Sequence, residues 1–114
     1  MTWRRVLFAI VWLFTLAAAL APARHAPTLG MSDKVNHIAA FLTLAVFAAW
    51  AWPRARLIVV AIALSAFGAA IEGLQALPVI ARDAEWADWF ADTAAVTVAL
   101  LAVHVVRSVR RRAG

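Results

Sequence analysis

The stretch that decides the fold is "AFGAAIEGLQALPVIARDAEWADWFADTAAV", Ala66 to Val96. It begins as sequence apolar enough for a membrane interior, and Glu72 and Gln75 then interrupt it. Further charged residues follow the glutamate, namely Arg82, Asp83, Glu85, Asp88 and Asp92. A carboxylate inside hydrocarbon-compatible sequence is costly, so a compensating group is expected nearby.

The composition of the whole chain has the same apolar character. The 114 residues are 66% hydrophobic and only 15% charged, and the mean hydropathy is +0.85. These values are far from those of a soluble domain and predict an integral membrane protein. Cysteine is absent, which excludes disulfides, a thiolate nucleophile and a cysteine-ligated metal.

The net charge of +5 comes from basic residues in short groups between the apolar runs. The groups are Arg4 with Arg5, Arg54 with Arg56, and Arg107 with Arg110, Arg111 and Arg112. We interpret them as topology signals and as contacts for anionic lipid. A nucleic-acid partner is therefore not predicted.

Four apolar segments are predicted to be transmembrane helices, over residues 6–21, 35–52, 57–78 and about 88–106. Each is close to the ~20 residues that a helix needs to cross a ~30 Å hydrocarbon core. None alternates like a barrel strand, and so few segments could not close a barrel. The predicted fold is an all-α membrane protein, a compact four-helix bundle that forms one domain over residues 1–114.

The distribution of basic residues predicts the orientation. With the N-terminus in the cytoplasm, the eight arginines of the three groups lie inside, and only Arg24, Lys34 and Arg82 lie outside. Both termini are therefore predicted to be cytoplasmic.

The first segment also resembles a secretory signal, because Ala21-Pro22-Ala23 follows its apolar run. We expect it to be retained, since a proline lies within the cleavage motif and the run is long enough to span. Cleavage would leave three spans in the same orientation, so topology does not decide between the two.

Three of the predicted helices each carry a pair of polar residues near the outer leaflet. Within a pair the residues are three or four apart, so they share a helix face. The pairs are Asp33 with His37, Glu72 with Gln75, and Asp88 with Asp92. Glu72 is expected about 9 Å below Pro78. Ionisable groups in membranes usually face the bundle interior and pair with one another, so the three pairs are predicted to converge at one depth.

Several groups could compensate Glu72. Arg82, Lys34 and His37 are the candidate counter-ions, and Gln75 is a hydrogen-bonding neighbour. Otherwise the glutamate must carry a proton, because burial disfavours the charged form. Small residues at helical spacing around it predict the close approach of another helix; they are Gly68, Ala69, Ala70 and Gly73.

The polar residues resemble the VanZ family of small bacterial membrane proteins. The similar pieces are "SDKVNHIAAFLTLA", which begins at Ser32, and "IEGLQALPVIARDAEWADWFADTAAV", which begins at Ile71, and the resemblance covers about residues 32–106. The family-type polar set consists of Asp33, Lys34, His37, Glu72, Gln75, Arg82 and Asp88. Two departures are that Asp92 stands where the family often has asparagine, and that the segment between Gln75 and Arg82 lacks a proline-glycine step.

The resemblance implies a place in the bacterial cytoplasmic (inner) membrane. Some VanZ-like proteins are associated with reduced susceptibility to teicoplanin, a glycopeptide that acts at the outer face of the membrane on lipid-anchored cell-wall precursors. The partners that it implies are membrane lipids and a lipid-linked precursor, and no protein partner is indicated.

The first functional hypothesis is an outward-facing polar pocket that binds or chemically alters a lipid headgroup or lipid-linked precursor. His37 would be the acid-base group with Glu72 and Asp88 as partner carboxylates, and Lys34 and Arg82 would clamp an anion. The remaining candidate substrate-binding residues are Asp33, Gln75 and Asp92. Histidine and carboxylates are also metal ligands, but no ligand spacing indicates a metal, so neither a metal nor another cofactor is predicted.

Two alternatives stay open. In one, the chain is a non-enzymatic membrane module whose buried polar residues only fix helix packing, and the activity belongs to a partner. In the other, it forms an ion or proton path. The path is disfavoured because the inner half of the spans is almost wholly apolar, with His104 the only titratable group near that end.

Overall fold

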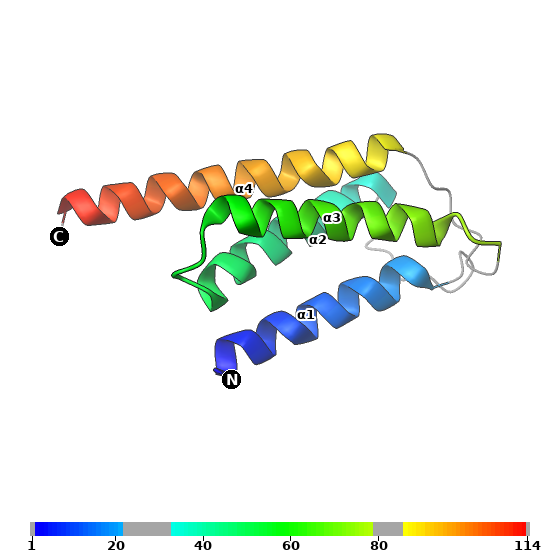
Figure 1. Ribbon diagram of the computed structural model, residues 1–114, viewed down its shortest axis with the longest axis horizontal. Helices are drawn as coiled ribbons and strands as arrows, with labels where there is room; N and C mark the ends of the chain where they lie inside the picture. The colour runs from blue at the N-terminus through cyan, green and yellow to red at the C-terminus, as the bar shows by residue number, and fades with distance from the viewer. Residues whose placement is uncertain (1, 22–32, 79–85, 114) are drawn as a thin grey trace.

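The computed structural model describes residues 2–21, 33–78 and 86–113, apart from the side chains of Asp33 and Lys34. Within these ranges the chain forms four helices, which confirms the predicted all-helical fold. They are α1 (Trp3–Leu20), α2 (Asp33–Ala51), α3 (Leu57–Gln75) and α4 (Trp86–Ala113). In Figure 1 the two chain ends and the α2–α3 turn lie at one end of the bundle, so neighbouring helices along the chain run in opposite directions.

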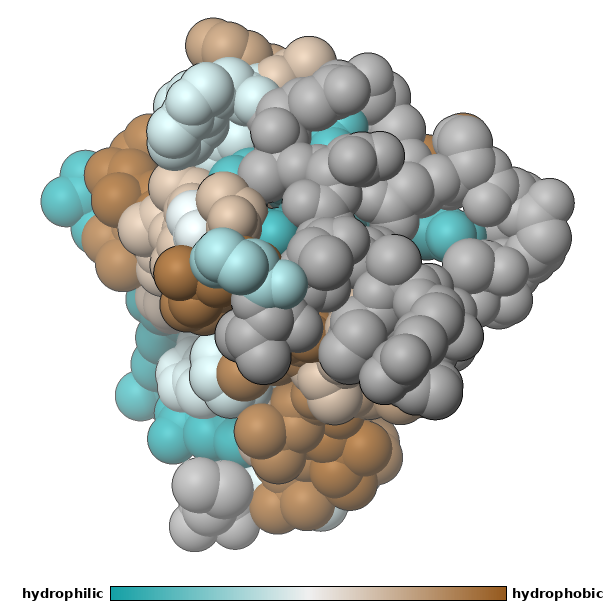
Figure 2. Space-filling model, turned by 90° about the vertical axis from the view of Figure 1, so that its right-hand side faces the viewer, coloured by the Kyte–Doolittle hydropathy of each residue, from teal (hydrophilic) through white to brown (hydrophobic). Residues whose placement is uncertain are grey.

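Three of the helices, α1, α3 and α4, are long and apolar enough to cross a membrane. In α2 the apolar helical stretch is Val35–Ala51, which is shorter. Large apolar side chains such as Phe14, Ile62 and Val98 are more than 60% exposed on their helices. Figure 2 shows extensive apolar surface on the flanks of the bundle. Apolar outer faces of this extent suit a lipid environment.

The helix bounds differ from the predicted segments for local reasons. α1 begins at Trp3 because the Thr2 hydroxyl accepts the backbone N–H of Arg5, at 3.4 Å, as an N-cap. α3 ends at Gln75, shortly before Pro78, since a proline disfavours helical backbone in the residue before it. Glu72 therefore lies in the last turn of α3, nearer the helix end than predicted. α4 continues to Ala113 through arginines that suit a helix C-terminus.

Arginines from α1 and α4 hold the C-terminal end of α2. The last carbonyls of a helix have no partner within the helix and attract cations. The contacts are Arg4 Nη1 to Trp50 O at 3.4 Å, Arg5 Nε to Ala51 O at 3.5 Å, and Arg107 Nη2 to Ala49 O at 2.9 Å. The arginine groups that predict topology thus also join three helices at this end.

The core lies between α2, α3 and α4. Its most buried side chains include Phe41 and Leu44 of α2, Ile71 of α3 and Val96 of α4, each at most 1% exposed. α1 packs on α2 and α3, with the Trp12 and Phe67 rings 5.2 Å apart. This arrangement holds together the ends of α2, α3 and α4 that lie opposite the arginines, where the polar pairs lie.

Candidate functional site

Three ionisable side chains from three helices meet at the end of the bundle opposite the arginines. His37 lies in the second turn of α2, Glu72 in the last turn of α3, and Asp92 in the second turn of α4. All are buried, with exposed fractions of 7%, 4% and 0%. Antiparallel helices bring the start of α2 and of α4 beside the end of α3, as the predicted convergence requires.

The contact geometry makes these residues one group, the His37–Glu72–Asp92 cluster. His37 Nδ1 lies 3.5 Å from Asp92 Oδ1. One nitrogen or oxygen atom from each of the three side chains lies within 4.8 Å of the others. The 3.5 Å separation is longer than a good hydrogen bond, and the two side chains form an ion pair only when the imidazole is protonated.

Gly68 of α3 lies next to the Asp92 carboxylate. Gly68 is one turn before Glu72 on α3, and a Cβ at this position would lie 3.4 Å from Asp92 Oδ2. The same Cβ would lie 3.5 Å from the rings of Phe41 and Trp89. The predicted close approach of a neighbouring helix is therefore found at Gly68. At Gly73 a Cβ would meet no described atom within 4 Å.

A second polar contact between α3 and α4 lies deeper than the cluster. Trp89 Nε1 donates to the Ser65 carbonyl at 2.9 Å, and the Ser65 and Thr93 hydroxyls are 2.9 Å apart. Sequence reasoning missed these residues. Single hydroxyls in apolar helices usually bond to their own backbone, as Thr43 does to Ala39 O at 2.8 Å, so nothing in the pattern distinguishes Ser65.

The other residues of the predicted site have different positions. Asp88 is buried one turn outward from Asp92 and does not belong to the group of three donors. Gln75 is fully buried, but its Nε2 donates to Ala19 O at 2.8 Å and so joins α3 to α1. The side chains of Asp33 and Lys34, and Arg82 as a whole, lie outside the described residues, so their predicted contacts stay predictions.

The donor set of the cluster suits two kinds of chemistry. An imidazole and two carboxylates are ordinary ligands for Zn²⁺ and related divalent cations. A carboxylate beside one imidazole nitrogen also orients the ring and leaves the other nitrogen to exchange a proton. Sequence spacing did not indicate a metal because the three donors come from three helices.

The chain was compared with protein-family models, curated proteins and solved structures. No family model, curated protein or solved structure matches the chain. Function is therefore inferred from the chemistry and position of the cluster, with the VanZ-like motif as an expectation.

Proposed function

We propose that this chain is a multi-pass, VanZ-like protein of the bacterial cytoplasmic membrane that binds the headgroup of a lipid or lipid-linked envelope precursor at its outer side. The observation that carries the proposal is the convergence of His37, Glu72 and Asp92, all buried, within 4.8 Å of one another. Ionisable groups within membrane segments are costly, and they commonly mark substrate or ion sites.

The side of the membrane follows from the arginines. Those at the ends of α1, α2 and α4 lie at the opposite end of the bundle from the cluster. The positive-inside rule assigns their end to the cytoplasm. The cluster then belongs to the outer leaflet, where lipid-linked wall precursors are displayed and where teicoplanin acts.

The proposed recognition uses each residue differently. Asp92, close to Nδ1 of His37, holds the imidazole so that Nε2 can exchange a proton with an acidic headgroup such as a phosphate. Glu72 supplies the second carboxylate. Lys34 and Arg82 are the proposed cationic clamp on the headgroup, since fixed cations stabilise phosphate charge where water is scarce.

Substitution at the cluster tests this function. We expect His37→Gln and Glu72→Gln each to remove any reduction in teicoplanin susceptibility that the wild-type chain confers on a bacterial host. His104→Gln, which changes an exposed histidine of α4, should retain it. A fluorescent protein fused to Gly114 reports accumulation in every strain and the cytoplasmic C-terminus. Cluster variants that accumulate normally and keep the full phenotype would exclude the proposed site.

A second candidate function is that of a structural membrane module. It is favoured by the nearby polar contacts that only join helices, Gln75 to Ala19 and Trp89 to Ser65. Removing one partner of a buried charge pair costs about 3–5 kcal/mol. This alternative expects the cluster variants to unfold at much lower temperature in detergent and to lose the phenotype only in proportion to lost protein. The binding proposal expects folded protein without the phenotype.

A further inference from the structure

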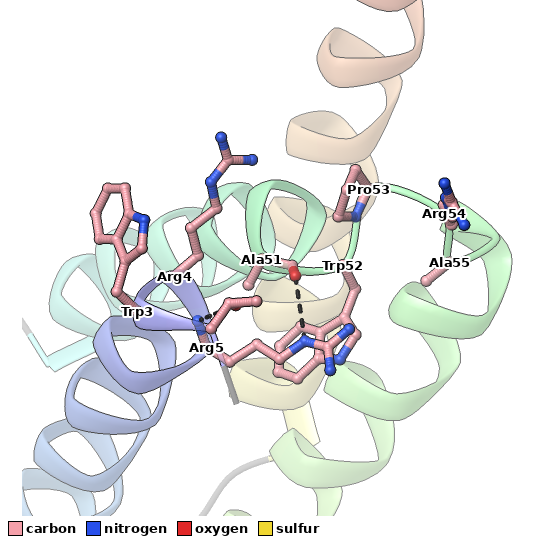
Figure 3. Close-up of a pocket in the computed structure, with 9 residues that line it drawn as sticks. Trp3, Arg4, Arg5, Ala51, Trp52, Pro53, Arg54 and Ala55 are labelled. Atoms are coloured by element: carbon pink, nitrogen blue, oxygen red, sulfur yellow. Dashed lines mark hydrogen bonds between the residues drawn. The ribbon is translucent and has the colours of Figure 1, made fainter.

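A hollow of about 460 Å³ lies at the arginine-rich end of the bundle. Its lining comes from the start of α1 and from the end of α2 with the turn that follows (Figure 3). The lining residues are Thr2, Trp3, Arg4, Arg5, Ala51, Trp52, Pro53, Arg54 and Ala55. The volume lies within the range of sites for small molecules, about 300–1,000 Å³.

The charged side chains that line this hollow are all positive. Arg4, Arg5 and Arg54 line it, whereas all six acidic residues of the chain lie elsewhere in the sequence, at positions 33, 72, 83, 85, 88 and 92. No carboxylate among the lining residues neutralises the three guanidinium groups. A cavity of this composition selects an anionic ligand.

Two of the arginines are held in place and still have donors to offer. The Arg5 guanidinium lies 5.3 Å from the centre of the Trp52 ring, and that of Arg4 lies 5.1 Å from the Trp50 ring. Each also makes one hydrogen bond to the end of α2. A guanidinium carries several N–H groups in a planar fork that matches phosphate oxygens. These contacts therefore position the two side chains and leave further N–H groups that can donate to a ligand.

The third arginine of the hollow, Arg54, can use all of its N–H groups for a ligand. Arg54 is exposed in the α2–α3 turn and makes no hydrogen bond or ion pair with any residue that the structure describes. In Figure 3 it lies across Pro53 from Arg4. The first turn of α1 adds backbone N–H groups and the positive end of a helix dipole on the same side.

The apolar surface of α1 that follows the arginines favours a lipid over a soluble anion as the ligand. Val6, Leu7 and Ile10 follow the arginines on α1 and expose apolar side chains, which offer a surface to acyl chains. Trp3 is 65% exposed at the rim, as tryptophans at headgroup depth are. We infer that the Arg4–Arg5–Arg54 hollow binds the phosphate of an anionic phospholipid. This site is separate from the outer cluster and does not depend on the proposed function.

Two arginines of the same turn provide a matched test. Arg54 lines the hollow, whereas Arg56 is also exposed, does not line it and caps α3 without a side-chain hydrogen bond. Short-chain phosphatidylglycerol is titrated into the detergent-solubilised full chain, and the rise in unfolding temperature is followed. Because one arginine near a lipid phosphate contributes about fivefold in affinity, Arg54→Gln should weaken binding about fivefold and Arg56→Gln less than about twofold.

Two further ligands identify the chemistry. Phosphatidylcholine of the same chain length should stabilise the wild-type protein far less, and inorganic phosphate should require much higher concentration than phosphatidylglycerol. Equal losses in Arg54→Gln and Arg56→Gln would show diffuse electrostatic attraction and overturn the site. Inorganic phosphate that binds as tightly as phosphatidylglycerol, with the same dependence on Arg54, would overturn the assignment to lipid.

Discussion

Asp92 is the residue on which the His37–Glu72–Asp92 cluster depends most. It is the fully buried carboxylate, it lies 3.5 Å from His37, and its second oxygen occupies the space beside Gly68. The VanZ-like resemblance favours Asp88 as the partner carboxylate of His37, whereas helical spacing only places Asp88 and Asp92 on the same face of α4. The two aspartates differ in how far along α4 they lie, and the position of α4 along α2 decides which of them meets His37. The spacing of residues within one helix does not predict this position.

The contact between His37 and Asp92 should be measurable as an energetic coupling. We expect His37→Gln and Asp92→Asn to be non-additive in thermal unfolding in detergent, with a coupling of about 1 kcal/mol, since directly interacting residues couple. His104→Gln combined with Asp92→Asn is the control pair and should be additive. Additivity in the first cycle would mean that the two side chains do not act together in the folded protein.

At the scale of the helices, α3 is the element that organises the site. It contributes Glu72, it brings α4 close at Gly68, and it holds α1 through Gln75. The stripe of small residues around Glu72 predicts a close helix approach but does not say which residue makes it. The structure selects Gly68, because Gly73 lies on the exposed side of the helix.

The two glycines should therefore differ in their tolerance of a large side chain. Gly68→Leu must displace Asp92, Phe41 or Trp89, and we expect it to lower the free energy of unfolding by about 2 kcal/mol, as overpacking does. Gly73→Leu should not lower it, because this position is exposed and glycine within a helix is less favourable than other residues by about 1 kcal/mol. Both are read by thermal unfolding in the same detergent. Equal destabilisation by the two substitutions would contradict the packing of α4 on α3 described above.

For the molecule as a whole, the sequence predicts those features that follow from the composition and spacing of residues along one segment. Hydropathy predicts the four helices, and the spacing of the polar pairs together with alternating helix direction predicts that the three pairs converge at one end of the bundle. Contacts that depend on which helix faces meet could not be predicted from one sequence. Examples are the arginines that cap α2 and line the inner hollow, and the bond from Gln75 to α1. Hydrophobic periodicity carries no information about such partners, since every outer face in lipid is apolar.

We propose that the molecule has two separate polar ends and that the end with the His37–Glu72–Asp92 cluster binds an amphiphile through His37. The most direct test is the NMR signal of the histidine side chains in phosphatidylcholine nanodiscs as a polyprenyl phosphate is added. The Arg54→Gln chain is used so that the inner hollow contributes little, and the three histidines are assigned by single substitutions. We expect the His37 imidazole signals to shift saturably while those of His104 stay fixed. His37 signals that do not move, or that move only in parallel with those of His104, would contradict the proposed site.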